Sequence, residues 1–155
     1  MPSFRSTQSV QHSPVQMFDL VADVERYPEF LPLCESLRVL RRSQSGEGVE
    51  TLVAAMSVGY KAIRESFTTR VTLDRPRLRI LVEYVDGPFK YLENRWTFKP
   101  NASGCDVEFF ISYEFRSLTL GILMGSVFEK AFRRFVDAFE ERAEAIYGQP
   151  AVARA

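Results

Sequence analysis

The side chains that could carry out catalysis are few and scattered along the chain. The only histidine, His12, precedes the first expected helix, and the two cysteines, Cys34 and Cys105, are far apart. An enzyme needs an acid, a base or a nucleophile held together in one cavity, so a serine, histidine and acid triad is not expected. Two distant cysteines without CxxC spacing indicate reduced thiols rather than a disulfide framework or a zinc site. We therefore predict no catalytic residue, no metal ligand and no cofactor.

Two polar residues nevertheless fall among the apolar positions of expected strands. Glu65 shares strand parity with Phe67, where a carboxylate is costly to bury unless it pairs with a basic residue such as Arg64. A simpler explanation is an irregularity of strand register. Asn94 shares parity with Trp96 and could donate a hydrogen bond to a bound carbonyl, or bond the backbone as an ordinary buried amide. Neither residue by itself indicates a reaction.

The elements that position these residues begin with a strand over residues 3–10. Ser13 and Pro14 supply an N-cap and a proline at the first helical position, so the first helix starts there. It should end before Tyr27, because Pro28 disfavours helical geometry in the preceding residue. We expect two short helices between the first strand and the rest of the sheet.

From residue 35 to residue 115 the hydrophobic period is two, with turn signals between the segments. This pattern predicts six antiparallel strands, or six to seven with the opening strand. One face of the sheet should be apolar and aromatic and the other polar. Residues 118–147 have helical periodicity, with an apolar stripe on one face and charged residues on the other.

A sheet with one apolar face and a helix with one apolar stripe can bury those surfaces only against each other. The predicted fold class is therefore α+β, with a curved antiparallel sheet wrapped around a long C-terminal helix. The length of the chain predicts one domain, residues 1–148, followed by a disordered tail, residues 149–155. A twisted sheet need not close on the helix along its whole length, so a cavity can remain at one end.

The segment VERYPEFLPLC, residues 24–34, is the unusual connection in this plan. Pro28 and Pro32 bracket Tyr27, Phe30 and Leu31, although a surface loop normally carries polar turn residues. We interpret it as a stiff cover over the open end of the cavity. Residues 118–128 are apolar around almost their whole circumference, and we hypothesise that they form an exposed lip together with Phe30 and Leu31.

The order of elements resembles the START-like, helix-grip superfamily, whose members hold hydrophobic molecules between the sheet and the last helix. Residues 27–34 are similar to the YPxFLPxC segment of the coenzyme Q-binding proteins and of the related ribosome-association toxins. Asp86-Gly87-Pro88-Phe89 and residues 135–143 are further matches. This resemblance implies noncatalytic binding of ubiquinone or a related polyprenyl lipid in support of respiratory electron transport. It equally admits a ribosome-associated inhibitor of translation or, less readily, a polyketide cyclase or dehydratase.

The residues expected to bind the ligand come from the proline-bracketed segment, the apolar sheet face and the last helix. They are Tyr27, Phe30, Leu31, Pro32, Tyr60, Phe67, Trp96, Phe98, Phe109, Tyr113, Leu123, Phe128, Phe132 and Phe135.

Charge and targeting signals limit the partners and the compartment. Twenty basic and twenty acidic residues cancel, which argues against nucleic-acid binding by bulk charge. A ribosome-binding surface would therefore need a local basic cluster, for which the candidates are Arg38, Arg41, Arg42, Arg64 and Arg70. The N-terminus has no signal or transit pattern. We expect a bacterial cytoplasmic protein that contacts the surface of the inner membrane transiently.

Overall fold

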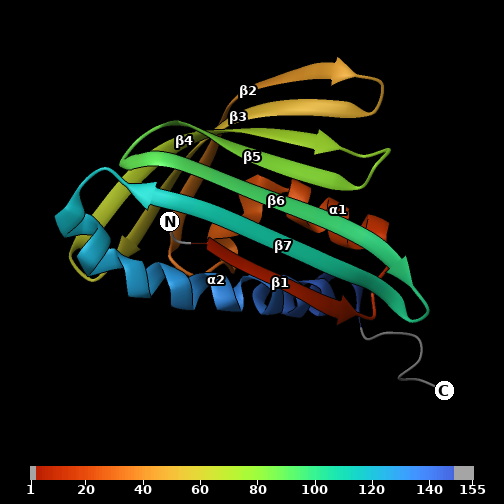
Figure 1. Cartoon of the computed structure of the whole chain (residues 1–155). Coiled ribbons are helices and arrows are strands. Elements are labelled where there is room, and N and C mark those ends of the chain that lie inside the picture. The colour runs from red at the N-terminus through yellow and green to blue at the C-terminus, as the bar shows by residue number, and fades with distance from the viewer. Residues whose placement is uncertain (1–2, 149–155) are drawn as a thin grey trace.

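A computed structural model describes residues 3–148 of the chain (Figure 1). The predicted tail, residues 149–155, lies outside the described residues. The elements in chain order are β1 (Ser3–Val10), α1 (Pro14–Ala22), the 3-10 helix η1 (Val24–Glu29), β2 (Cys34–Gly46), β3 (Val49–Tyr60), β4 (Ile63–Asp74), β5 (Arg79–Asp86), β6 (Phe89–Asn101), β7 (Gly104–Phe115) and α2 (Leu118–Tyr147).

The strands form one antiparallel sheet in the order β1-β7-β6-β5-β4-β3-β2, so β1 and β2 are its edges. The sheet curves, and α2 lies along its concave face with β1 and β7 beside it (Figure 1). The predicted α+β helix-grip architecture is confirmed. Each of the six strands expected between residues 35 and 115 is present.

Local capping explains where the two α-helices begin. The Ser13 hydroxyl accepts a hydrogen bond from the backbone N–H of Gln16, and the Gln16 side chain accepts one from the backbone N–H of Ser13. The Ser117 hydroxyl caps α2 in the same way by accepting from the N–H of Leu120. The predicted bounds of α2 agree with the structure.

The first helix is shorter than the sequence predicts. It ends at Ala22, because Asp23 has non-helical dihedral angles, and the 3-10 helix η1 follows. Tyr27 and Pro28, expected beyond the first helix, lie within η1. The 3-10 turn accepts Pro28 because proline fixes φ near −65°, which suits that geometry. The prediction of two short helices is thus correct, while the boundary between them is not.

The core is the space between α2, α1 and the concave sheet face. Strand β7 alternates buried and less buried residues over its whole length, so Val107, Phe109 and Ile111 face α2. Side chains on the other face of β7 include Glu108 and Phe110. No helix within residues 3–148 has the length and hydrophobicity needed to cross a bilayer.

Candidate ligand cavity

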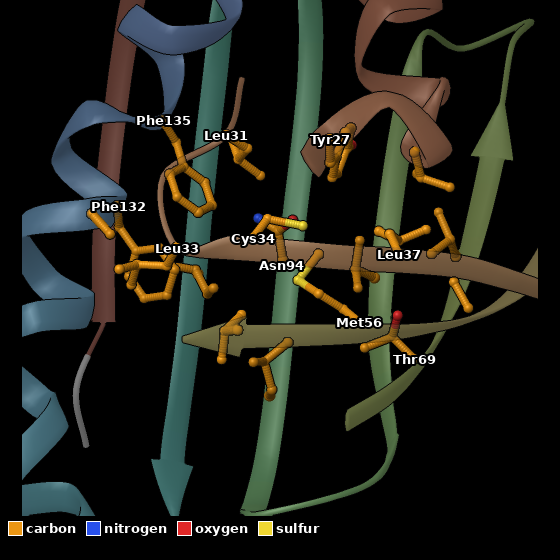
Figure 2. A pocket seen from close by; sticks show the side chains of 18 of the residues that line it. Tyr27, Leu31, Leu33, Cys34, Leu37, Met56, Thr69, Asn94, Phe132 and Phe135 are labelled. Carbon is orange, nitrogen blue, oxygen red and sulfur yellow. The ribbon is translucent and has the colours of Figure 1, made fainter. Parts of the chain in front are cut away.

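A cavity of about 110 Å³ lies between the concave face of the sheet and α2. This volume is several times the roughly 10 to 15 Å³ that one enclosed water needs on the same measure. The cavity is therefore larger than a gap left by imperfect side-chain packing. Figure 2 shows side chains from α2, from the segment after η1 and from the strands converging on this space. The lining residues are Val24, Tyr27, Leu31, Pro32, Leu33, Cys34, Leu37, Ala54, Met56, Val58, Phe67, Thr69, Val71, Ile80, Val82, Leu92, Asn94, Trp96, Ile111, Phe128, Ala131, Phe132, Phe135 and Phe139.

One wall of the cavity is a row of aromatic rings on α2. Phe128, Phe132, Phe135 and Phe139 are three or four residues apart, so they share one helix face. Phe132 packs edge-on against Phe135 at 5.2 Å between ring centroids, and Phe139 packs edge-on against Trp96 of β6 at 5.2 Å. The helical repeat therefore gives the cavity a continuous aromatic side.

The proline-bracketed connection supplies another part of the cavity wall. Leu31, Pro32, Leu33 and Cys34 all line the cavity, and Figure 2 shows Leu31, Leu33 and Cys34 beside it. The backbone N–H of Leu31 donates to the carbonyl of Tyr27 at 2.8 Å. Leu33 has φ of 69°, an uncommon value for a residue with a side chain, and its carbonyl accepts from the N–H of Gly59 at 3.0 Å. Residues 27–34, which we call the cover segment, are thus fixed at both ends.

Aromatic packing attaches the cover segment to α2. The rings of Tyr27 and Phe30 each pack edge-on against Phe139, with centroids 5.3 Å and 5.1 Å away. The Tyr27 hydroxyl donates to the carbonyl of Val21. Burial of Tyr27 raises the pKa of its hydroxyl well above the usual value, and Cys34 and Asp23 add to that effect. The hydroxyl is therefore a fixed donor and not an acid.

The polar groups of the cavity are few and mostly engaged. The Asn94 amide nitrogen donates to the carbonyl of Phe110 at 2.9 Å, and its oxygen accepts from the Trp96 indole at 2.8 Å. Asn94 is therefore the backbone-bonded amide that the sequence allowed as an alternative, although it also faces the cavity. Thr69, Tyr27 and Cys34 are the other lining residues with a polar side-chain group.

The cysteines lack the environment of a nucleophile. Burial raises the pKa of the Cys34 thiol to about 11 and that of Cys105 to about 11. Since the thiolate is the reactive form, both thiols are almost wholly protonated near neutral pH. The two cysteines are free and buried. His12 is also buried, but it lies between β1 and α1, near Tyr147 rather than at the cavity.

Eight of the fourteen predicted ligand residues line the cavity. They are Tyr27, Leu31, Pro32, Phe67, Trp96, Phe128, Phe132 and Phe135. They belong to the cover segment, β4, β6 and α2, so these parts of the chain converge on one space.

Three further predicted residues are buried in the solid core instead. Phe98 packs against Phe18 of α1 with centroids 6.0 Å apart. Phe109 and Tyr113 have the inward parity of β7, but their neighbours fill the space around them, with Phe132 at 6.4 Å and 5.4 Å respectively. Strand parity gives the face of a sheet and not the position along it, so these three predicted residues do not line the cavity.

The remaining three predicted residues lie outside the cavity for other reasons. Phe30 packs edge-on against Phe139, beneath the Arg142 guanidinium. Tyr60 is at the exposed end of β3, with the Lys61 ammonium 5.4 Å from its ring centroid. Leu123 is on the solvent face of α2.

The predicted lip needs a related correction. Phe30 contacts Phe139, which is sixteen residues, or about 24 Å of helix, beyond Leu123. Leu31 is buried at the cavity. The cover segment and the apolar start of α2 are therefore separate surfaces.

Glu65 has the inward parity that the sequence predicted, since it lies opposite Val58 on β3. It is absent from the cavity lining, and no carboxylate of the described residues lines that space. Groups of three or more potential metal ligands are likewise missing from residues 3–148. The described lining therefore offers a largely apolar surface without a carboxylate.

Sequence reasoning missed several lining residues on β2, β3 and β5. Leu37, Ala54, Met56, Ile80 and Val82 all face the cavity. Alternation along β5 places Ile80 and Val82 on the inward face, but aliphatic side chains do not distinguish cavity lining from ordinary core. On β3 a parity count starting from Leu52 would have found Ala54 and Met56.

The candidate basic cluster on β2 and β4 is largely neutralised. Arg42 pairs with Glu25 and Glu50, Arg64 with Glu35, and Arg70 with Glu83. Among the ion pairs of residues 3–148, Arg38 and Arg41 take no part. Two exposed arginines on an edge strand remain, which is a small basic surface.

Similarity to known proteins places this geometry in a family. Residues 10–140 match the family model described as "Polyketide cyclase / dehydrase and lipid transport". The chain belongs to this family. A START superfamily protein from Mycobacterium smegmatis has the same fold, with a TM-score of 0.76 at 19% identity over 93% of this chain and 98% of that chain.

Two curated members of the family carry different functional names. A "Ribosome association toxin RatA" from Vibrio cholerae is 39% identical over 90% of this chain and 94% of its own length. A "Coenzyme Q-binding protein COQ10 homolog B, mitochondrial" from Xenopus laevis is 34% identical over 88% of this chain and 56% of its own length. The predicted resemblance to a START-like family with these two kinds of member is confirmed.

Proposed function

We propose that this protein binds an apolar ligand in the cavity between α2 and the sheet, without catalysing a reaction. The lining carries this proposal, because it consists of aromatic and aliphatic side chains from the cover segment, six strands and α2. Such a surface favours a hydrophobic molecule over water. Its amide and thiol groups either bond the protein itself or stay protonated.

Within this class, the ligand that we propose is ubiquinone or a related polyprenyl lipid, bound in support of respiratory electron transport. The Xenopus relative's name and the YPxFLPxC resemblance support this choice. About fifteen buried tail carbons at roughly 0.8 kcal/mol each give on the order of 12 kcal/mol of gross stabilisation. Association and ordering cost about 4 to 15 kcal/mol, so the expected affinity is moderate and permits release.

A cyclase or dehydratase reaction is the weaker proposal for this cavity. That chemistry needs several polar groups arranged around a polar substrate. The described lining offers Tyr27, Cys34, Thr69 and Asn94 as its polar side chains. The buried thiol and phenol have raised pKa values, so neither serves as a base at neutral pH.

Trp96 provides the direct test, because it is the only tryptophan in the chain and lines the cavity. Titration with a short-chain ubiquinone analogue should quench its fluorescence to saturation. Ala54→Leu, which extends a side chain into the cavity, should weaken that response. Ala55→Leu is the matched control, since Ala55 is the next residue of β3 and points to the opposite face.

Both variants must first retain the far-ultraviolet circular dichroism of the fold. Equal quenching in both variants, or no saturable quenching of the original protein, would contradict cavity binding. Mass spectrometry of an organic extract of protein purified from a bacterial lysate then identifies the lipid class. Detection of a ubiquinone-sized polyprenyl compound would support the narrower proposal. Detection of a different apolar lipid instead would contradict ubiquinone as the ligand.

Ribosome association is a second proposal, supported by the names of relatives such as the Vibrio cholerae protein. It would use an outer surface, so it is compatible with a filled cavity. Arg38 and Arg41 on β2 are the residues we propose for it, because the other candidate arginines pair with carboxylates. Cosedimentation with ribosomal subunits at moderate salt should fall in an Arg38→Glu, Arg41→Glu variant, and unchanged cosedimentation would contradict this surface.

A further inference from the structure

The first turns of α2 expose apolar side chains where a soluble helix normally exposes polar ones. Leu118, Ile122 and Leu123 are 82%, 74% and 56% exposed. On the opposite side of the same turns, Met124 and Phe128 are buried in the core. The helix is therefore apolar on both sides here, and only one side is explained by the fold. We call Leu118, Ile122 and Leu123 the apolar tip.

Charge changes along α2 in a fixed order away from the apolar tip. Residues 117–128 contain no charged side chain. Next come the exposed residues Glu129, Lys130, Arg133 and Arg134, three of them basic, with Arg116 just before the helix. Farther along, the exposed residues are mainly acidic and include Asp137, Glu141 and Glu144. The order is thus apolar, then basic in net charge, and then mainly acidic.

This order matches the layers of an anionic membrane surface. Apolar side chains enter the boundary of the acyl chains, and basic ones lie at the depth of the phosphates. Arg133 pairs with Glu129, whereas Lys130, Arg134 and Arg116 take part in none of the ion pairs of the described residues. These three side chains are available to lipid phosphates, since Glu129 is paired with Arg133. The acidic residues from Asp137 onward lie farther along the helix from the apolar tip.

The apolar tip also lies close to the ligand cavity. Phe128, which lines the cavity, is six residues after Ile122, or about 9 Å along the helix axis. Phe128 in turn packs against Phe115 and Phe89 at the ends of β7 and β6. A molecule leaving the bilayer beside the apolar tip would therefore be near the aromatic wall.

We propose that the apolar tip of α2 docks this protein on an anionic phospholipid bilayer, so that ligand passes between membrane and cavity at that end. The passage of ligand rests on the proposed function, whereas docking itself does not. A bilayer explains the surface better than a second copy of the chain. A symmetric tip-to-tip pair would bring the basic residues of both copies together, which is unfavourable.

The test is flotation of the full chain with vesicles of phosphatidylethanolamine and phosphatidylglycerol, beside vesicles of phosphatidylcholine alone. We expect binding to the anionic vesicles that weakens with salt. A double variant, Ile122→Asp with Leu123→Asp, should lower it more than about tenfold. Ile146→Asp is the matched control, because Ile146 is 51% exposed at the other end of the same helix. Lys130→Glu with Arg134→Glu should also weaken binding at low salt.

Three results would overturn docking by the apolar tip. They are unchanged flotation of the tip variant, an equal loss in Ile146→Asp, and equal binding to neutral and anionic vesicles. Size-exclusion chromatography without lipid supplies a fourth, if the original chain is a dimer and the tip variant a monomer. Trp96 quenching separates this inference from the proposed function. The tip variant should keep its response to the quinone analogue, and Ala54→Leu should keep vesicle binding.

Discussion

Arg142 on α2 donates a hydrogen bond to the carboxylate of Glu29, 113 residues earlier in the chain. The same guanidinium lies 5.1 Å from the centroid of the Phe30 ring. Arg142 therefore contacts two neighbouring residues of the cover segment. Its guanidinium pairs with the carboxylate of Glu29 and lies over the aromatic face of Phe30. This contact, together with Phe139, connects the cover to the helix that forms the aromatic wall of the cavity.

Replacing Arg142 by methionine should loosen the cover segment without unfolding the protein. Methionine keeps the apolar stem but loses the bond to Glu29 and the contact with Phe30. We expect faster hydrogen exchange at the backbone N–H of Leu31, measured by NMR or mass spectrometry. Arg134→Met is the matched control on the exposed face of α2. Equal exchange in the two variants would show that Arg142 does not restrain the cover.

The same contact predicts a dependence of stability on pH. Hydrogen bonds from Arg142 and then from Arg26 hold the pKa of Glu29 below its usual value. A lowered folded-state pKa stabilises the folded protein above the unfolded pKa, and that contribution is lost as the pH falls through the folded value. The difference in melting temperature between the original protein and Glu29→Gln should therefore shrink from about pH 7 to about pH 3. A constant difference over this range would contradict the contribution of Glu29.

Phe139 should be the most costly truncation near the cavity. Its ring packs edge-on against Tyr27, Phe30 and Trp96, so it joins the cover, α2 and the sheet. Phe139→Ala should lower the free energy of unfolding in urea by about 3 to 5 kcal/mol. Phe139→Leu keeps more volume and should cost less. A loss below about 1 kcal/mol for the alanine variant would contradict this central packing role.

Cys34 should react slowly with alkylating reagents although it lines the cavity. Burial raises its pKa to about 11 from a usual value of 9.0, which reduces the thiolate fraction near neutral pH by about a hundredfold. Iodoacetamide labelling of Cys34 in a Cys105→Ser background, followed by mass spectrometry, measures this rate. Saturating quinone analogue should slow it further. A rate equal to that of a free thiol would mean that the cavity is open to water.

Some properties of this protein follow from local sequence. Ser13 with Pro14 predicts where α1 begins, since capping depends on residues three positions apart. Helical periodicity predicts α2 over residues 118–147. Alternation along β7 likewise predicts which side chains point inward, because the period of a strand is two. The fold class follows from these patterns, since the two apolar surfaces can be buried only against each other.

Only the tertiary structure determines which of the inward-facing residues line the cavity. Trp96 and Phe109 share the concave face on paired positions of β6 and β7, yet only Trp96 lines the cavity. Phe30 and Leu31 are adjacent in sequence, but Leu31 faces the cavity while Phe30 packs outside against Phe139. Periodicity is a local property, whereas a cavity is the volume left after side chains from distant segments have packed. That volume depends on contacts such as Glu29 with Arg142, which no local pattern contains.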